Sequence, residues 1–467
     1  MTTLWSGRFD AAPDQAAFEW GSSFSFDRRL FEDDVRGSIA WARALEKAGV
    51  LSRQEAVAID TALQAILERG RSDPAFVSGP DEDVHSFVER LLVERLGDAG
   101  KRLHTGRSRN EQVSLDLRLY LRRRIPRLQR AAAEVVGALL AQARAAGDAL
   151  MPAYTHFRPA QPVLVAHFLL AHVAPLRRDH DRLARACEEA NDLPLGSGAV
   201  AGTSYPIDVK LVAADLGFTR VVANSIDASS DRDFAASFLY AGAMTMVHLS
   251  RLAEDLIILC GDEHRFFEFS DALSTGSSMM PQKKNPDPLE LVRGKTGRSI
   301  ADLLALLTTM KGIPSGYNKD LQEDKHAVFD AEDTVAGCLA VVKSVVGGLS
   351  LNRERAARAA SGQLLATDVA DYLVGKGMPF RRAHEVVGAL VRKLVAEGRE
   401  FGSLTVADWR SASELFEPDV LNRVTPEASV RAKQTPQSTA PPAVYAAMAD
   451  IDRWLATALL PLENQLC

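Results

Sequence analysis

The chain has 467 residues, of which 46% are hydrophobic and 25% charged, which is typical of a folded globular protein with material for about three domains. Its net charge of −6 argues against a nucleic-acid-binding surface, because such surfaces are normally basic. We find no run of 18 apolar residues and no apolar signal-peptide core near Met1, so neither a membrane span nor a signal peptide is expected. The four cysteines lie far apart, which favours a reducing, cytoplasmic location.

Short helices are predicted for residues 1–107, which we interpret as an N-terminal helical domain. Asp27 is a candidate N-cap for an amphipathic run that ends at Gly49. Ser52 and Glu55 then form a capping-box pattern, which predicts a second helix that ends near Gly70.

Much longer helices follow in residues 108–360, because apolar residues recur there every three or four positions. Strand signals are nearly absent apart from residues 218–222. The shorter helices of residues 361–467 predict a third domain, and the fold class is mostly α. Five long helices of this kind suggest a bundle or an oligomeric core; their approximate ranges are 108–146, 160–190, 233–263, 287–311 and 320–348.

Two loops and one basic run need interpretation. Arg109 and Asn110, at a helix start, could hold a carboxylate. The Gly196–Gly202 stretch resembles a dinucleotide loop, but its spacing is one residue too wide and a helix precedes it, so a tight connection between helices is predicted. The arginines from Arg118 to Arg130 are spread around a helix, which favours solvated faces and inter-helix ion pairs.

The segment 274–288, between two predicted long helices, is rich in hydrogen-bond donors. Its serines, lysines and backbone N–H groups suit an anion. Pro281, Pro286 and Pro288 disfavour a regular helix or an inner strand here, so an ordered loop is predicted. Pro286 and Pro288 are tolerated at the start of the helix that follows. The positive end of that helix is a second reason to expect a carboxylate or phosphate.

The string GSSMMPQKKNPDPLELVRGKTGR, at residues 276–298, resembles the signature of the aspartase/fumarase superfamily and, within it, of the argininosuccinate lyase family. The resemblance covers nearly the whole chain. Its other strings are Leu4–Phe9, Asp81–His85, Leu103–Asn110, Tyr154–His156, Leu195–Ala199, Asp231–Phe234 and Tyr317–Lys325.

This resemblance implies a β-elimination that cleaves argininosuccinate into arginine and fumarate. Such a reaction needs a base, an acid and donors for the developing negative charge. By resemblance, Ser277 is the base, His156 the acid and Glu290 the carboxylate that orients His156. A serine hydroxyl is a poor base, so backbone N–H groups, the helix terminus and Lys283 would have to stabilise its alkoxide. The sequence alone does not decide between Ser277 and His156 as the base.

The resemblance also implies how the substrate is held. The residues expected to grip its succinyl carboxylates are Ser23, Asn110, Thr155, Lys283 and Asn285, with Arg109 beside them, and those near its other amino-acid part are Tyr317, Gln322 and Lys325. In the family these residues meet because three subunits of a homotetramer share each site around a twenty-helix core, five helices per chain. No cofactor is implied, and no histidine spacing predicts a metal site.

Three positions depart from the family pattern: Glu111 stands where Asp is usual, Phe157-Arg158 where Leu-Gln is common, and Gln437-Ser438 where Gly-Gly is usual. The alternatives are another fumarate-releasing enzyme, such as an adenylosuccinate lyase, and a crystallin-like structural protein of the same fold. The sequence Gln282–Asn285 favours argininosuccinate over adenylosuccinate. Retention of Ser277, His156, Glu290 and Lys283 favours an enzyme.

Overall fold

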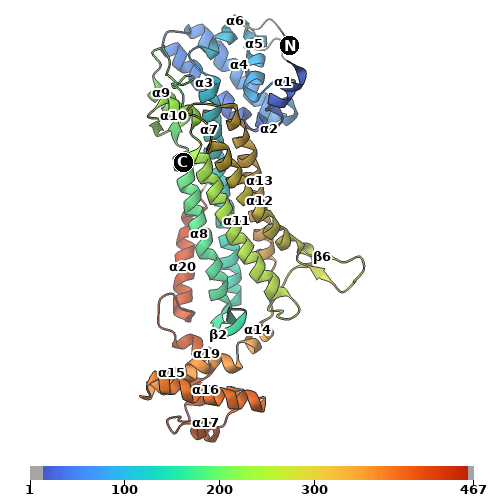
Figure 1. The fold of residues 1–467 in the computed structure, drawn as a ribbon, viewed down its shortest axis with the longest axis vertical. Helices are drawn as coiled ribbons and strands as arrows, with labels where there is room; N and C mark the ends of the chain where they lie inside the picture. The colour runs from blue at the N-terminus through green and yellow to red at the C-terminus, as the bar shows by residue number, and fades with distance from the viewer. Residues whose placement is uncertain (1–13, 461–467) are drawn as a thin grey trace.

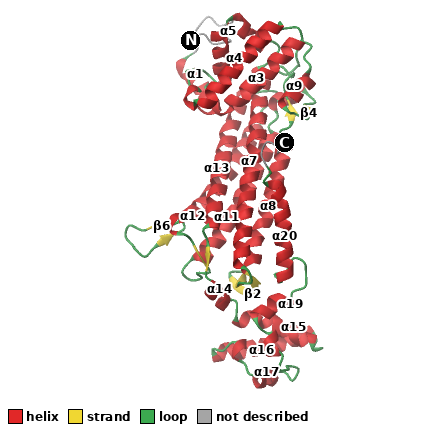
Figure 2. Cartoon of the chain, turned by 180° about the vertical axis from the view of Figure 1, so that it is seen from behind, coloured by secondary structure: helices red, strands yellow, loops and turns green. Residues whose placement is uncertain are grey.

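The computed structural model describes residues 14–460, so the Leu4–Phe9 string and Cys467 lie outside the described residues. The molecule is elongated and mostly helical (Figure 1). Long helices run side by side through its middle, with one group of shorter helices at each end (Figure 2). The predicted mostly α fold class is confirmed. Among the described helices, none is long and apolar enough to cross a bilayer.

Short helices form the upper end of Figure 1. The capping box at Ser52 and Glu55 is confirmed. The N-cap prediction for Asp27 is wrong: Asp27 ends α2, and its carboxylate instead accepts bonds from Ser23 Oγ (2.5 Å) and Val84 N (3.0 Å). The helices at this end are α1 (Gln15–Gly21), α2 (Phe24–Asp27), α3 (Phe31–Lys47), α4 (Arg53–Ser72), α5 (Val84–Leu96), α6 (Asp98–Lys101), α9 (Val209–Leu216) and α10 (Ser225–Ser230).

Five long helices build the bundle, as the periodicity predicted. Their apolar faces join those of the upper helices in one continuous hydrophobic core. Two starts differ from the prediction: residues 158–164 form a strand before α8, and a 3-10 turn, Lys319–Glu323, precedes α13. The long helices are α7 (Arg109–Ala146), α8 (Val165–Glu189), α11 (Asp233–Cys260), α12 (Asp287–Met310) and α13 (Asp324–Gly347).

The arginine-rich start of α7 ties helices together. Arg123 pairs with Asp33 of α3 (2.7 Å) and Arg124 with Glu332 of α13 (2.5 Å). The prediction of inter-helix ion pairs is therefore confirmed. Arg118 was expected on a solvated face or in such a pair; it is buried and bonded to Asp231.

The structure contains a β-hairpin that the sequence did not predict, because strand signals are weak there. β1 (Leu150–Thr155) pairs antiparallel with β2 (Arg158–Leu164) between α7 and α8. The other pairs are two residues long: β3 (Asp192–Leu193) with β4 (Arg220–Val221), β5 (Phe267–Glu268) with β8 (Ser350–Leu351), and β6 (Thr275–Gly276) with β7 (Lys284–Asn285). β4 lies inside the predicted β-prone segment 218–222.

A second, smaller hydrophobic core gathers residues between Leu365 and Val424 at the lower end. After it, the last described helix returns alongside α7 and α8. The division into domains 1–107, 108–360 and 361–467 stays a prediction. The helices at the lower end are α14 (Arg353–Ala359), α15 (Ala366–Gly375), α16 (Phe380–Glu397), α17 (Val406–Ala412), α18 (Val420–Arg423) and α19 (Pro426–Ala432). The helix that returns along the bundle is α20 (Pro441–Ala458).

Candidate active site

A cleft of about 730 Å³ lies at the upper end of the bundle. It brings together five of the predicted substrate-binding residues from distant parts of the sequence: Ser23, Arg109, Tyr317, Gln322 and Lys325. Ser23 is the N-cap of α2, and Arg109 lies in the first turn of α7. Tyr317 and Gln322 come from the segment that leads into α13, and Lys325 lies in the first turn of α13. Burial raises the pKa of Tyr317 to about 12, so its phenol stays protonated at neutral pH and can donate a hydrogen bond.

The ammonium of Lys325 is held from behind by a buried carboxylate. Asp324 accepts from Lys325 Nζ (2.6 Å) through one oxygen and from Arg232 Nε (2.5 Å) through the other. All three residues are buried. Burial opposes ionisation of Asp324, but Lys325 and Arg232 outweigh it and lower its pKa. Two cations therefore share one anion, which leaves a positive charge available to a ligand at the cleft.

Acidic groups face Arg109 across the same cleft. Its guanidinium lies 3.5 Å from Asp83 and 3.8 Å from Glu89, and it donates to Gln112 (2.9 Å). Burial alone would raise the pKa of Asp83, but Arg109 and His85 lower it to about 2. In this structure, Arg109 thus orients toward its own helical neighbours and acidic groups as well as toward the cleft.

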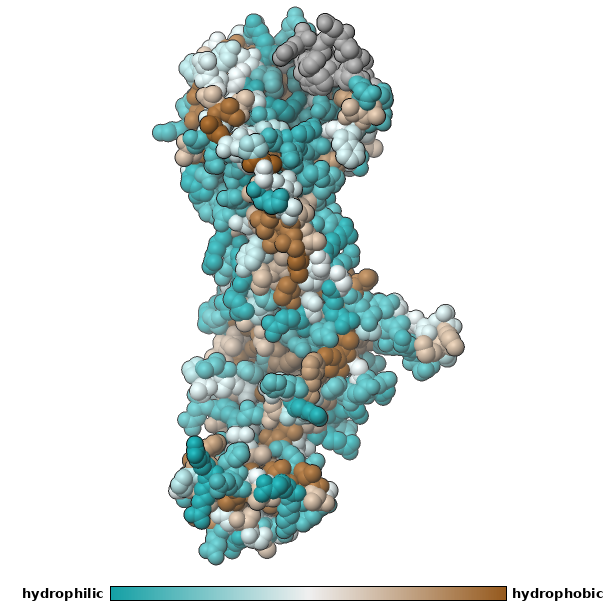
Figure 3. Space-filling model, in the orientation of Figure 1, coloured by the Kyte–Doolittle hydropathy of each residue, from teal (hydrophilic) through white to brown (hydrophobic). Residues whose placement is uncertain are grey.

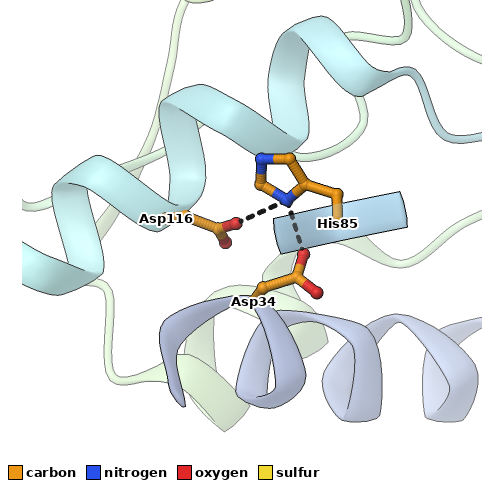
Figure 4. A group of neighbouring side chains, drawn as sticks. All are labelled: Asp34, His85 and Asp116. Atoms are coloured by element: carbon orange, nitrogen blue, oxygen red, sulfur yellow. Dashed lines mark hydrogen bonds and ion pairs between the residues drawn. The ribbon is translucent and has the colours of Figure 1, made fainter. Parts of the chain in front are cut away.

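A buried histidine between two aspartates lies at the wall of the cleft (Figure 4). His85 Nδ1 is 2.9 Å from Asp34 and 3.1 Å from Asp116. Burial disfavours the charged ring, but Asp34 and Asp116 outweigh it and raise the pKa of His85 to about 10. Asp34, His85 and Asp116 also form the one group of metal-ligand types found among the described residues, with donor atoms within 4.8 Å. Burial and the nearby charge of Asp34 raise the pKa of Asp116 well above its usual range, whereas His85 outweighs burial at Asp34 and lowers the pKa of that carboxyl. The contacts are therefore those of an imidazolium that bonds to ionised Asp34, with Asp116 beside it.

Asn110 follows Arg109 on α7 and lies beside the glycine loop 196–202. Its side-chain amide donates to Ala199 O (3.5 Å). The loop lies between the helices α8 and α9, as predicted, but the connection is not tight: it spans residues 190–208, and the two-residue strand β3 precedes the loop. Its backbone amides face a carboxylate of the same chain: Gly196 N and Gly198 N donate to Glu111.

Thr155 and His156 lie at the tip of the β1–β2 hairpin, at the opposite end of the bundle (Figure 1). Thr155 pairs with Arg158, so His156 and Phe157 form a two-residue turn. Both have positive φ, 53° and 55°, as a type I′ turn requires, although neither is the glycine or asparagine that such turns favour. Both side chains are exposed, and Phe157 is 83% accessible.

Ser277 lies in an arm that projects from the side of the bundle (Figure 1). The short β6–β7 pair closes this arm, and α12 begins at Asp287 with a proline in its first turn, as predicted. Ser277 Oγ accepts hydrogen bonds from Met280 N (3.0 Å) and Met279 N (3.3 Å). These two backbone N–H groups would stabilise negative charge on that oxygen.

The other predicted residues of the arm differ in their contacts. Lys283 is exposed, while the neighbouring Lys284 bonds to Asp271 (2.9 Å) and Phe269 O. Asn285 donates weakly to Thr275 (3.4 Å). Glu290 lies on the first turns of α12, half-exposed, 3.8 Å from Arg293. Among the described residues, no ion pair joins Glu290 to His156.

The three groups of predicted residues are far apart within one chain. Helix α7 has 38 residues and spans roughly 57 Å at 1.5 Å per residue. It separates the cleft, at its first residue, from the hairpin that follows its last. No side chain bridges such a distance, so the cleft and the hairpin do not form one site within a single chain, and the arm projects from the side of the bundle between them (Figure 1).

Sequence reasoning missed several buried charges around the cleft: Asp34, Glu111, Asp116 and Arg232 were not named as functional candidates, and neither was Asp324. Arg232 and Asp324 stood in quoted strings, and Glu111 was named as a departure from the family pattern, but none of the three was given a role. The available signal was a charged residue on an otherwise apolar helix face, as for Asp116, which lies three residues after Val113 and three before Leu119. That pattern predicts a buried, partnered charge but does not identify the partner.

Comparisons with known proteins agree with this architecture. A family model described as lyase matches residues 7–300, and one described as argininosuccinate lyase C-terminal matches residues 363–431. Among solved structures, an EDDS lyase in complex with formate superposes with a TM-score of 0.83 at 26% identity, covering 97% of this chain and 94% of that one. A fumarate lyase/delta crystallin from Brucella melitensis shares the fold, with a TM-score of 0.75 at 19% identity over 92% and 94% of the two chains.

The fold and these matches define a lyase of the aspartase/fumarase superfamily. Curated relatives are closer. The argininosuccinate lyase of Symbiobacterium thermophilum is 47% identical over 467 residues, all of both chains, and that of Pelotomaculum thermopropionicum is 49% identical over 96% of this chain and 98% of its own. The chain belongs to the argininosuccinate lyase family.

Proposed function

We propose that this chain cleaves argininosuccinate into arginine and fumarate. The observation that carries the proposal is the environment of Ser277, whose Oγ accepts two backbone N–H bonds in a loop rich in cationic and amide donors. A base oxygen needs this stabilisation before it can remove a proton from carbon. Relatives that are 46–49% identical and bear the name argininosuccinate lyase support this choice of substrate.

The proposed reaction has two proton movements. The alkoxide of Ser277 removes a proton from the carbon beside one succinyl carboxylate, which gives a dianionic aci-carboxylate. The C–N bond then breaks, His156 protonates the leaving nitrogen, and fumarate and arginine result. Glu290 orients the imidazole of His156 and favours its protonated form. The donors Lys283 and Asn285 on the arm, with Thr155 beside His156, compensate the accumulating negative charge.

Substrate binding at the cleft would use the residues gathered there. Ser23 and Arg109 of the cleft, with Asn110 beside the 196–202 loop, would hold the succinyl carboxylates, as the family resemblance implies. Tyr317, Gln322 and Lys325 would hold the other amino-acid part; Lys325 offers the positive charge that Asp324 leaves available. The acidic groups in the cleft, such as Asp83 and Glu89, carry charge complementary to a guanidinium.

A homotetramer would complete each site. Exposed apolar side chains are arrayed along α12, including Leu291 (61%), Leu304 (57%) and Leu307 (45%), and Tyr240 of α11 adds to them. Hydrophobic residues gather along the bundle in Figure 3. Such a surface favours burial against other copies of the chain. The twenty-helix core, a role in arginine biosynthesis and a cytoplasmic location rest on the family resemblance.

The deciding experiment is a fumarate assay. Purified protein is mixed with argininosuccinate, and absorbance of the fumarate double bond is followed, with arginine measured in parallel. We expect both products in equal amounts. Adenylosuccinate and EDDS serve as competing substrates. Release of fumarate from adenylosuccinate, with none from argininosuccinate, would overturn the assignment, and no turnover of any of the three would favour a structural role.

A further inference from the structure

Glu111, in the first turn of α7, is a fully buried carboxylate with three backbone donors. Its Oε1 accepts from Ser108 N (3.0 Å), and its Oε2 accepts from Gly196 N (2.8 Å) and Gly198 N (2.9 Å). The first bond completes a capping box within α7. The other two join α7 to a loop more than eighty residues later in the chain.

The glycine loop 196–202 can adopt its shape only with glycine at key positions. Gly196, Gly198 and Gly202 all have positive φ. A Cβ on Gly198 would lie 2.4 Å from Gly202 O, so no other residue fits there. Converging backbone N–H groups of this kind usually bind an anion. Here the anion is the carboxylate of Glu111, which explains why the loop resembles a phosphate-binding sequence.

The same loop contacts two predicted substrate-binding elements. Ala199 O accepts from the side-chain amide of Asn110 (3.5 Å). Val200 packs against Gly316, where an added Cβ would lie 3.3 Å from Val200 Cγ1, and Gly316 precedes Tyr317. Ser225 Oγ holds Val200 O from the other side (2.7 Å). The loop therefore lies between the residues expected to bind the two parts of the substrate.

We propose that Glu111 is a positioning residue: its carboxylate fixes the 196–202 loop, and the loop fixes Asn110 and the Gly316–Tyr317 turn for substrate binding. This role rests on the proposed function. Burial raises the pKa of Glu111 to about 7, while its three backbone N–H bonds favour the charged form. The ionised carboxylate can accept all three N–H bonds, whereas an amide would turn an N–H group toward one of these donors.

The primary test is Glu111→Gln, which keeps the size of the side chain but removes its charge. We expect KM for argininosuccinate to rise by about tenfold or more, since at least one buried N–H loses its partner and the loop shifts. The value of kcat should change by less than about threefold, because Ser277 and His156 are untouched. Glu111→Asp, which restores the charge on a shorter side chain, should recover most of the lost affinity.

A matched control is Glu332→Gln. Glu332 is equally buried and bonded, to Arg29, Arg124 and Tyr120, but contacts neither the loop nor the cleft. This variant should unfold at lower denaturant concentration with KM unchanged. An equal rise in KM for Glu332→Gln would mean that any buried charge loss has this effect, and would overturn the role of Glu111.

A second variant keeps the proposal testable if Glu111→Gln does not fold. Gly198→Ala leaves Glu111 intact but forces the loop apart at Gly202 O, so it should raise KM as well. If Gly198→Ala and a folded Glu111→Gln enzyme both keep the wild-type KM, the positioning role of Glu111 is overturned, while the proposed function is not affected. Failure of the wild-type protein to release fumarate would instead overturn the proposed function.

Discussion

Asp324 bonds to two cations that come from different helices, Arg232 and Lys325. The Asp324 carboxylate that joins them is buried. Each of the three charges is therefore stabilised by the others, because water does not reach them. Only Lys325 lines the cleft. The orientation of its ammonium toward a substrate is therefore set by a residue that does not line the cleft itself.

We predict that Asp324→Asn raises KM for argininosuccinate by about tenfold or more. The substitution should also lower the free energy of unfolding by roughly 3–5 kcal/mol, because it leaves two buried cations with one neutral partner. Steady-state kinetics and urea denaturation measure the two effects. Asp33→Asn is the control: Asp33 is equally buried and pairs with Arg123 (2.7 Å), and neither residue lines the cleft. It should lose stability with KM unchanged, and a wild-type KM in Asp324→Asn would contradict the role of Asp324.

Individual site residues could be predicted where they belong to a recognisable motif. They could not be predicted where their role depends on a partner from a distant part of the chain. Ser23, Arg109 and Lys325 were named from the resemblance, and the structure gathers them in one cleft. Asp324 lies beside Lys325 in the same motif but was not singled out, because nothing in the sequence shows that Arg232 reaches it. Buried ion pairs depend on how helices dock, which local patterns do not encode.

At the level of elements, the long helices were predictable because their apolar repeat extends over many turns. The β1–β2 hairpin was missed for identifiable reasons. Proline is disfavoured within strands, so Pro152, Pro159 and Pro162 weaken the strand signal of this segment, and His156-Phe157 lacks the Asn-Gly or Gly signal of a two-residue turn. The hairpin forms nonetheless, and it is the element that carries the proposed acid.

Close packing between α3 and α4 gives a second prediction. A Cβ on Gly70 would lie 2.2 Å from the ring of Phe31, which is itself buried. Gly70→Ala should therefore lower the free energy of unfolding by about 1–3 kcal/mol through overpacking. Gly388 of α16 has nothing within 4 Å of such a Cβ, so Gly388→Ala should raise stability by about 0.5–1 kcal/mol. Chemical denaturation distinguishes the two, and stabilisation by Gly70→Ala would show that α3 and α4 pack less tightly.

For the whole molecule, the length of α7 decides how a site can form. The cleft and the hairpin lie at opposite ends of a helix that spans roughly 57 Å, so residues of one chain alone do not meet. The family resemblance predicts that several subunits share each site, and this stays a prediction. The sequence could not predict which surfaces meet, because assembly depends on the shapes of exposed faces.

Mixing inactive variants tests whether sites are shared. Ser277→Ala and His156→Asn should each lower turnover by roughly 10²–10⁴-fold, as expected for a positioned acid or base. Tetramers that contain both kinds of chain should regain part of the fumarate release, because some sites then combine an intact arm with an intact hairpin. Exchange of subunits is verified by mass spectrometry of tagged chains. Mixed tetramers with no recovery would contradict shared sites.

The small core between Leu365 and Val424 has a consequence for how the chain can vary. The polypeptide enters this region from α14 and leaves it through α19, and α20 then runs back along α7 and α8. The chain thus enters and leaves this region at the same end of the bundle, so the region is topologically an insertion between the bundle helices and α20. Loops within it can lengthen, shorten or be exchanged without altering the register of the helices above.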